Sequence, residues 1–152
     1  MVITTRELME RDILRQAEEI LRSRLSTGTV LNQPETTRKY LQMKIADKPS
    51  EEFGGLFLDN RHRIIHEETM FYGTIDGANV YPRVVAQKAL RVNAAALIVY
   101  HNHPSGTPEP SHADRAVTKR LKDALDLVDV RLLDHIVVGY EGTVSFAERG
   151  WI

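Results

Sequence analysis

The chain has 152 residues, of which 42% are hydrophobic, and these values are typical of one compact domain with a buried core. Its 20 Lys and Arg residues are balanced by 21 Asp and Glu residues, so no overall positive field attracts a polyanion, and a dedicated nucleic-acid-binding protein is disfavoured. Cysteine is absent, which excludes disulfides, thiol nucleophiles and thiolate metal sites. Any metal ion would therefore have to be bound by His, Asp or Glu.

The N-terminal sequence, Met-Val-Ile-Thr-Thr-Arg-Glu, becomes polar too early for the apolar segment of a signal peptide. No stretch approaches the apolar length that crosses a membrane. We therefore expect a cytoplasmic protein with no membrane partner. Its oligomeric state is left open, because an amphipathic N-terminal helix can pack internally or against a second chain.

Two helices are expected at the start of the chain. Thr4 and Glu7 form a capping-box pattern, after which apolar residues recur at helical spacing as far as Gly28. Pro34 can occupy the first turn of a second helix, which ends near Pro49. These helices are interpreted as an N-terminal extension that packs on the rest of the protein.

The remaining residues alternate between strand and helix patterns, which predicts an α/β sandwich. The chain is thus divided into a helical extension of residues 1–49 and a domain of residues 50–152. The predicted elements of this domain are a hairpin of residues 53–59 and 64–73, a helix from Pro82, a buried strand over residues 94–100, a helix from Ser111, and strands over residues 130–138 and 143–146.

A candidate metal site follows the buried strand. His101 and His103 stand two residues apart at its end, and such residues project to the same face of a strand. A loop rich in proline then returns the chain to Asp114, in the first turn of the next helix. Two nitrogens and one oxygen leave a fourth tetrahedral position open, which is the arrangement of catalytic zinc, where bound water has its pKa lowered to about 7.

Each part of this pattern has a simpler explanation. Ser111 and Asp114 also form a helix-capping pattern, and a lone pair of nearby histidines is weakly specific. Only the combination of the paired histidines, the loop and the aspartate predicts metal binding. His135 lies in an apolar strand and is interpreted as a buried structural residue, while surface positions are expected for His62, His66, His112 and Glu109.

Three segments resemble the RadC-like branch of the JAMM (MPN+) metalloproteases, which carry a JAB domain. They are His-Asn-His-Pro-Ser-Gly from residue 101, Pro-Glu-Pro-Ser-x-x-Asp from residue 108, and Leu-Leu-Asp-His-Ile-Val-Val-Gly from residue 132. The resemblance extends over residues 51–139. It implies a cytidine-deaminase-like three-layer α/β/α sandwich with a mixed sheet, Zn²⁺ on His101, His103 and Asp114, a Ser111 hydroxyl beside the metal, and hydrolysis of a peptide or isopeptide bond in a peptide or protein substrate.

The same resemblance implies a glutamate general base at the start of the first strand. Two residues compete for this role. The spacing to Phe53 that is usual in RadC-like sequences selects Glu51, whereas the position in other JAMM proteins selects Glu52, and we expect Glu51. Gly54 and the glycine after it replace bulkier residues, so a β-bulge here could change which glutamate faces the metal.

Two other functions compete with the metallohydrolase. A DNA-processing or DNA-repair role is suggested by the RadC name and by the letters His-Asn-His, although HNH nucleases draw their histidines from separate parts of a different element. Longer RadC-like proteins carry a helix-hairpin-helix region, and this chain has only two helices before its domain. A non-catalytic MPN-type scaffold is the third interpretation, and it is disfavoured because such domains generally lack the metal ligands.

Overall fold

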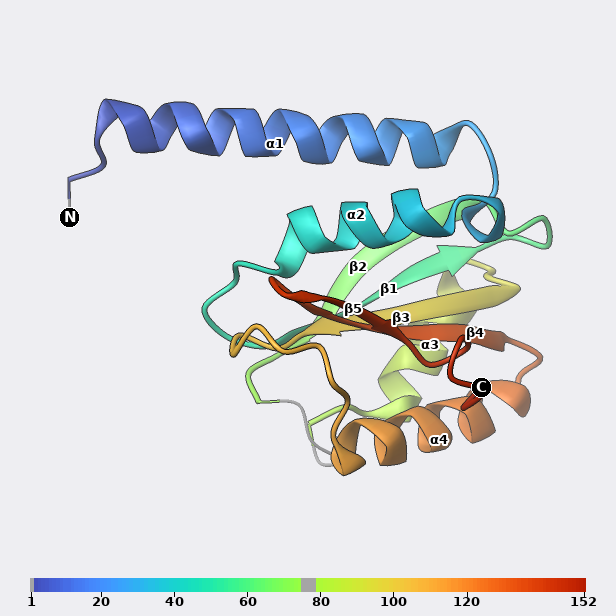
Figure 1. Ribbon diagram of the computed structural model, residues 1–152. Coiled ribbons are helices and arrows are strands. Elements are labelled where there is room, and N and C mark those ends of the chain that lie inside the picture. The colour runs from blue at the N-terminus through green and yellow to red at the C-terminus, as the bar shows by residue number, and fades with distance from the viewer. Residues whose placement is uncertain (1, 75–78) are drawn as a thin grey trace.

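Residues 2–74 and 79–152, which the computed structural model describes, form a five-stranded mixed sheet with helices on both faces (Figure 1). The strands are β1 (Glu52–Leu58), β2 (Ile64–Tyr72), β3 (Ala96–Asn102), β4 (Arg131–Gly139) and β5 (Gly142–Ser145). The helices are α1 (Thr5–Ser26), the short 3₁₀ helix η1 (Val30–Asn32), α2 (Pro34–Ile45), α3 (Pro82–Arg91) and α4 (His112–Asp126). The predicted α/β fold with a mixed sheet is confirmed.

The strand order is β2-β1-β3-β4-β5. β1 is antiparallel to both of its neighbours, and β4 and β5 form an antiparallel hairpin. β3 and β4 are parallel, and a parallel pair needs a crossover connection, which α4 provides. The carboxyl ends of β3 and β4 therefore lie at the same edge of the sheet, where the loop between β3 and α4 also begins.

The sheet has a hydrophobic core on each face. α3 and α4 cover one face, and α2 covers the other (Figure 1). Every residue of β3 is buried, because this central strand contributes alternate side chains to the two cores. This double burial explains the uninterrupted apolar run that precedes His101 in the sequence.

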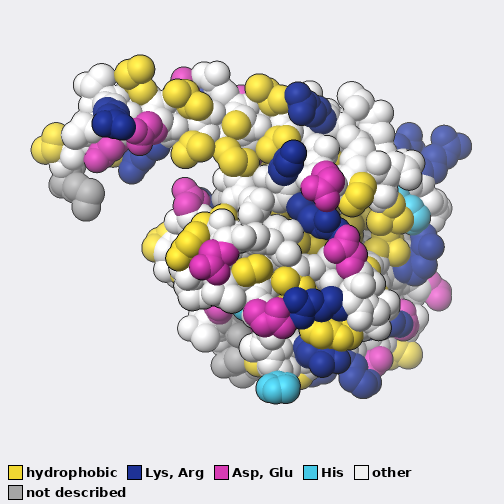
Figure 2. Space-filling model, in the orientation of Figure 1, with side chains coloured by type: hydrophobic (Ala, Val, Ile, Leu, Met, Phe, Trp, Pro, Cys, Tyr) yellow, Lys and Arg dark blue, Asp and Glu magenta, His cyan; other side chains and the backbone are white. Residues whose placement is uncertain are grey.

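The longest helix, α1, packs mainly on α2, and its C-terminal part also reaches the sheet (Figure 1). Its apolar residues are consequently divided: Leu25 is buried beside α2, whereas Leu8, Met9, Ile13, Leu14 and Ile20 are exposed, and hydrophobic side chains are visible along this helix in Figure 2. The division of the chain at residue 49 stays a prediction. No helix in the described part of the chain combines the length and the apolar character needed to cross a membrane.

A nearly buried carboxylate ties α1 and α2 to the edge strand β2. Glu67 accepts hydrogen bonds from Tyr40 and Lys44 of α2 and from Arg22 Nε of α1, the last at 3.1 Å. Burial opposes ionisation of Glu67, but the hydrogen bonds from Lys44 and Tyr40 outweigh burial and hold the pKa of this carboxyl below its ordinary value of 4.5. The contact joins both N-terminal helices to a strand residue that follows Lys44 by 23 positions.

Replacing Glu67 with Gln is expected to lower the free energy of unfolding by about 2 kcal/mol, because two partly buried cations lose their counter-charge. The pKa of Glu67 is lower in the folded protein, so its stabilising contribution is present above pH 4.5 and is lost as the pH falls through the folded pKa. Urea unfolding at pH 7 and pH 4 should therefore show a smaller difference between variant and wild type at pH 4. The exposed Glu10→Gln serves as the control, and an equal effect of both substitutions would refute the special role of Glu67.

Candidate metal centre

The first two candidate ligands stand at the carboxyl end of the central strand. His101 is the sixth residue of β3 and has no solvent exposure, and His103 follows the last residue of the strand. In the sheet, His101 lies opposite Phe53 of β1 and Val137 of β4. The rings of His101 and Phe53 are stacked with centroids 6.0 Å apart, which places both side chains on the face that α4 covers.

The loop after β3 is fixed to the hairpin of β4 and β5. His103 N donates to Val138 O at 2.8 Å, and Glu141 N donates to Gly106 O at 3.1 Å. Gly106 has φ of +96°, and a Cβ on Gly139 would lie 2.1 Å from Gly106 O, so both positions require glycine. The close backbone approach orients the loop that leads from His103 to α4.

Asp114 serves two purposes at the start of α4. Its backbone N–H donates to Ser111 Oγ at 3.1 Å, and its Oδ2 accepts from Ser111 N at 2.8 Å, which is a complete capping box. The carboxyl group is nevertheless 2% exposed and also reaches the two histidines. The capping interpretation and the ligand interpretation are thus compatible, because the cap fixes the carboxylate that faces the site.

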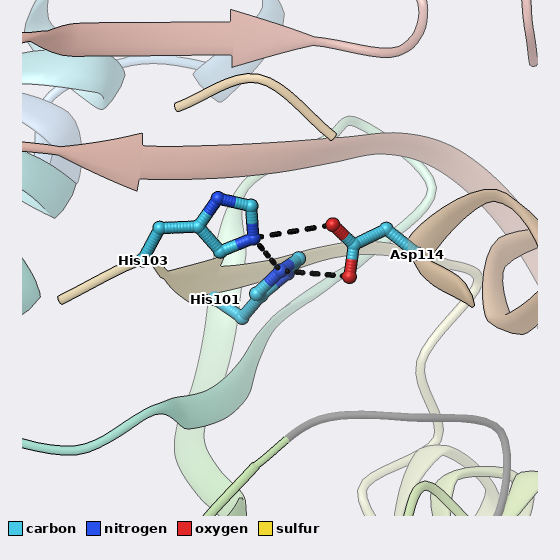
Figure 3. A group of neighbouring side chains, drawn as sticks. All are labelled: His101, His103 and Asp114. Carbon is cyan, nitrogen blue, oxygen red and sulfur yellow. Dashed lines mark hydrogen bonds and ion pairs between the residues drawn. The ribbon is translucent and has the colours of Figure 1, made fainter. Parts of the chain in front are cut away.

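The three side chains converge on one point (Figure 3). His101 Nε2 lies 3.1 Å from Asp114 Oδ1, His103 Nε2 lies 3.1 Å from Asp114 Oδ2, and the two Nε2 atoms are 3.1 Å apart. All three potential ligand atoms lie within 4.8 Å of one another. Loop, strand and helix therefore bring together the three residues that the sequence pattern selected, and this group could bind a metal ion.

The hydrogen bonds around the group suit a cation. Thr107 O can only accept, so the 3.0 Å contact requires His103 Nδ1 to donate, and in a neutral ring this leaves the Nε2 lone pair directed at the cluster. The hydrogen bond with Asp114, and then that with Thr107 O, raise the pKa of His103, although burial lowers it. Burial raises the pKa of Asp114, but the hydrogen bonds with His101 and His103 outweigh burial and hold this pKa well below its ordinary value. Lone pairs of nitrogen and carboxylate oxygen that meet in this way require a shared proton or a metal ion.

Comparison with known proteins agrees with this constellation. A family model described as RadC-like JAB domain matches residues 31–151, which is most of the chain. The chain belongs to the RadC-like JAB domain family. The family model begins before α2, the helix that covers the second face of the sheet.

Curated relatives of this RadC-like JAB domain are named UPF0758 proteins. One from Vibrio cholerae is 56% identical over 143 residues, which are 94% of this chain and 90% of that protein. One from Vibrio vulnificus is 55% identical over 92% of this chain and 62% of its own length, and one from Xanthomonas euvesicatoria is 57% identical over 90% and 60%. The chain therefore spans about three fifths of the length of the last two relatives.

In this chain Glu51 directly precedes β1, and Glu52 is the first residue of that strand. Successive residues of a strand point to opposite faces of the sheet. Phe53 stacks on His101, and strand alternation continued back from Phe53 assigns Glu51, two residues earlier, to the same face. The pKa of His103 is raised most by Asp114, next by the hydrogen bond with Thr107, and also by the negative charge of Glu51. The charge of Glu52, in contrast, acts on Tyr100, which lies in the core on the opposite face of the sheet. The pKa of Tyr100 is raised by burial first and then by several charges, including that of Glu52. This geometry favours Glu51 for the site, and its catalytic role stays a proposal.

The bulge considered for β1 at Gly54 is not found there: Phe53 pairs with Phe71 and Gly54 with Thr69, so the unpaired residue, Met70, belongs to β2. The register of β1 shifts after Phe53 only in its pairing with β2, while the pairing with β3 is regular. The glycine at position 54 has a packing reason, since its Cβ would lie 2.6 Å from Tyr100 Oη. The irregularity therefore does not alter the pairing of Phe53 with His101.

Asn102, between the two candidate histidine ligands, is a further residue of the site that sequence reasoning did not identify. Its side chain is fully buried and turns toward β1. Oδ1 accepts from Glu52 N at 2.7 Å, and Nδ2 donates to Ser50 O at 3.1 Å. The amide therefore holds the backbone on both sides of Glu51.

The other polar residues singled out in the sequence do not join the metal group among the described residues. His112 is exposed, His66 contacts Glu68 at 2.9 Å, and Glu109 makes a two-armed ion pair with Arg149 at 2.7 Å. His62 lies in the hairpin turn with φ of +60°. His135 is buried as expected, but it also contacts His101, which the sequence did not indicate.

Proposed function

We propose that this RadC-like JAB domain is a zinc-dependent hydrolase that cleaves an amide bond in a peptide or an isopeptide-linked protein. The observation that carries the proposal is the convergence of two Nε2 atoms and one carboxylate within 4.8 Å. This set of two nitrogens and one oxygen is the three-ligand arrangement of catalytic zinc, which leaves a position for water or substrate. When bound, zinc supplies a nucleophile at neutral pH by lowering the pKa of a water molecule, and it polarises the substrate carbonyl.

In this proposal Glu51 accepts the proton of the attacking water and delivers it to the leaving amine. The amide of Asn102 keeps the carboxylate beside the end of β3 by fixing Ser50 O and Glu52 N. Ser111 Oγ accepts from Asp114 N, so its O–H can donate to the oxygen of the substrate carbonyl as negative charge develops there. The capping serine would thus orient a metal ligand and stabilise the transition state.

The direct test is hydrolysis by the purified chain loaded with one equivalent of zinc. We expect cleavage of at least one member of a fluorogenic peptide and isopeptide library, with loss of activity in chelator and recovery on addition of Zn²⁺. Stoichiometric zinc without cleavage of any member would contradict the hydrolase and support a non-catalytic scaffold. Cleavage of DNA that depends on Asp114 would instead support the DNA-processing interpretation, which the net charge of -1 does not favour.

A further inference from the structure

A chain of buried hydrogen bonds extends from the candidate ligand His101 to the backbone of the candidate ligand Asp114. His101 Nδ1 lies 2.8 Å from His135 Nε2 on the neighbouring strand β4. His135 Nδ1 lies 2.6 Å from Thr118 Oγ1 of α4, and Thr118 Oγ1 lies 2.7 Å from Asp114 O. His101 and His135 have no solvent exposure, and Thr118 is 3% exposed.

The direction of these hydrogen bonds follows from their last member. A carbonyl oxygen can only accept, so the single hydroxyl hydrogen of Thr118 is committed to Asp114 O. Thr118 Oγ1 must then accept from His135 Nδ1. A fully buried imidazole is costly to charge, and a neutral ring that donates through Nδ1 accepts through Nε2. His101 Nδ1 is therefore the donor in its contact with His135.

We propose that His135 and Thr118 are positioning residues that keep a hydrogen on Nδ1 of His101, so that its Nε2 lone pair is available to the metal ion. The inference rests on the proposed metal site and deepens it. Partners of this kind orient metal-binding histidines, and their loss typically weakens metal binding about 10- to 100-fold. Here the partner is itself a histidine, and Thr118 fixes its hydrogen-bonding direction.

Packing fixes the plane of the His135 ring, and its hydrogen bonds fix which edge of the ring faces which partner. Phe146 stacks on it with centroids 4.6 Å apart, and Phe53 meets it edge-on at 5.6 Å. Nε2 of the ring points to His101 on the neighbouring strand, and Nδ1 points to Thr118 of α4, which covers this face of the sheet. His103 needs no such relay, because Thr107 O accepts directly from its Nδ1.

The test compares Thr118→Val, which has the same shape but no hydroxyl, with Thr118→Ser, which retains the hydroxyl. Thr37→Val is a matched control, because Thr37 is 2% exposed and donates to Gln33 O at 2.9 Å with the same four-residue spacing, on the opposite face of the sheet. Zinc affinity is measured by competition with a chromophoric chelator. We expect Thr118→Val to bind about tenfold more weakly than wild type, with Thr118→Ser and Thr37→Val within about threefold of it.

A second measurement does not require metal. Nitrogen-15 NMR of histidine-labelled, metal-free wild-type protein is expected to show hydrogen on Nδ1 of His101 and on Nδ1 of His135, with Nε2 of His135 unprotonated. In Thr118→Val the Nδ1 signal of His135 is expected to shift. An unprotonated Nδ1 on His101 in the wild type overturns the proposal, whether or not the variants fold.

The two proposals fail in different ways. If wild-type protein binds no zinc, the metal-centre proposal fails, while the NMR spectrum still decides the direction of the hydrogen bonds. If wild-type protein binds zinc and Thr118→Val binds it as tightly as Thr37→Val does, the positioning role of Thr118 is refuted and the metal centre stands. His135→Phe, which retains a packed ring without nitrogens, is expected to weaken zinc binding about 10- to 100-fold, and unchanged affinity would refute the role of His135.

Discussion

Purified His103→Ala protein is expected to bind zinc at least about a hundredfold more weakly than the wild type. Structural zinc sites with four ligands have binding free energies of about 10–16 kcal/mol, so one ligand accounts for about 3 kcal/mol, and each 1.4 kcal/mol is about a factor of ten. His103 is the ligand of choice for this substitution, because it follows β3 and is only partly buried, whereas His101 is part of the core. The measurement is zinc content after dialysis, together with chelator competition.

The matched control is His112→Ala. This histidine lies two residues before Asp114 and is exposed, so its removal changes the histidine count equally without touching the cluster. It should retain about one zinc per chain. Full zinc content in His103→Ala would disprove the ligand assignment, and a loss in both variants would indicate that zinc binds to surface histidines instead. Thermal unfolding of both metal-free variants separates loss of a ligand from loss of the fold.

The architecture was readable from the sequence because its signals are local. The capping residues Thr4 and Ser111, the proline at position 34 and the apolar run before His101 each specify an element through its own backbone chemistry, and the corresponding helices and strand are present. The arrangement of α1 was not readable in this way. Its periodic apolar residues predict a helix that is buried along one side, but α2 covers this face of the sheet, and much of the apolar side of α1 is exposed.

The three candidate ligands were also predictable, because the spacing of His101 and His103 in a strand and the first-turn position of Asp114 are local features. The residues that support them were not. His135 reaches His101 across 34 positions of sequence, and Asn102 reaches Ser50 across 52. Such contacts depend on the order of the strands in the sheet. A single sequence shows which residues are present but not which strands become neighbours.

The same long-range geometry defines the second large effect. Glu51→Gln is expected to lower kcat for amide hydrolysis by about 10²- to 10⁴-fold, because an amide of the same size cannot take a proton from the attacking water. Zinc affinity should be close to that of the wild type, since Glu51 lies outside the cluster of three ligands. The kinetics are to be measured on a substrate found in the library screen, with zinc content determined on the same samples.

Glu52→Gln provides the control that separates proximity in sequence from position on the strand. The two glutamates are adjacent, with Glu51 just before β1 and Glu52 its first residue. If the alternation of the strand continues to Glu51, it shares its face with Phe53 and His101, whereas Glu52 lies on the opposite face. Glu52→Gln should therefore retain kcat within about threefold, because it supplies no group to the proton transfer. A large loss in Glu52→Gln with an active Glu51→Gln would transfer the role of general base to Glu52.

Since Asn102 binds the backbone on both sides of Glu51 and not its carboxylate, Asn102→Ala should lower kcat at constant zinc content. The general base would then depend on an amide located between the two histidine ligands.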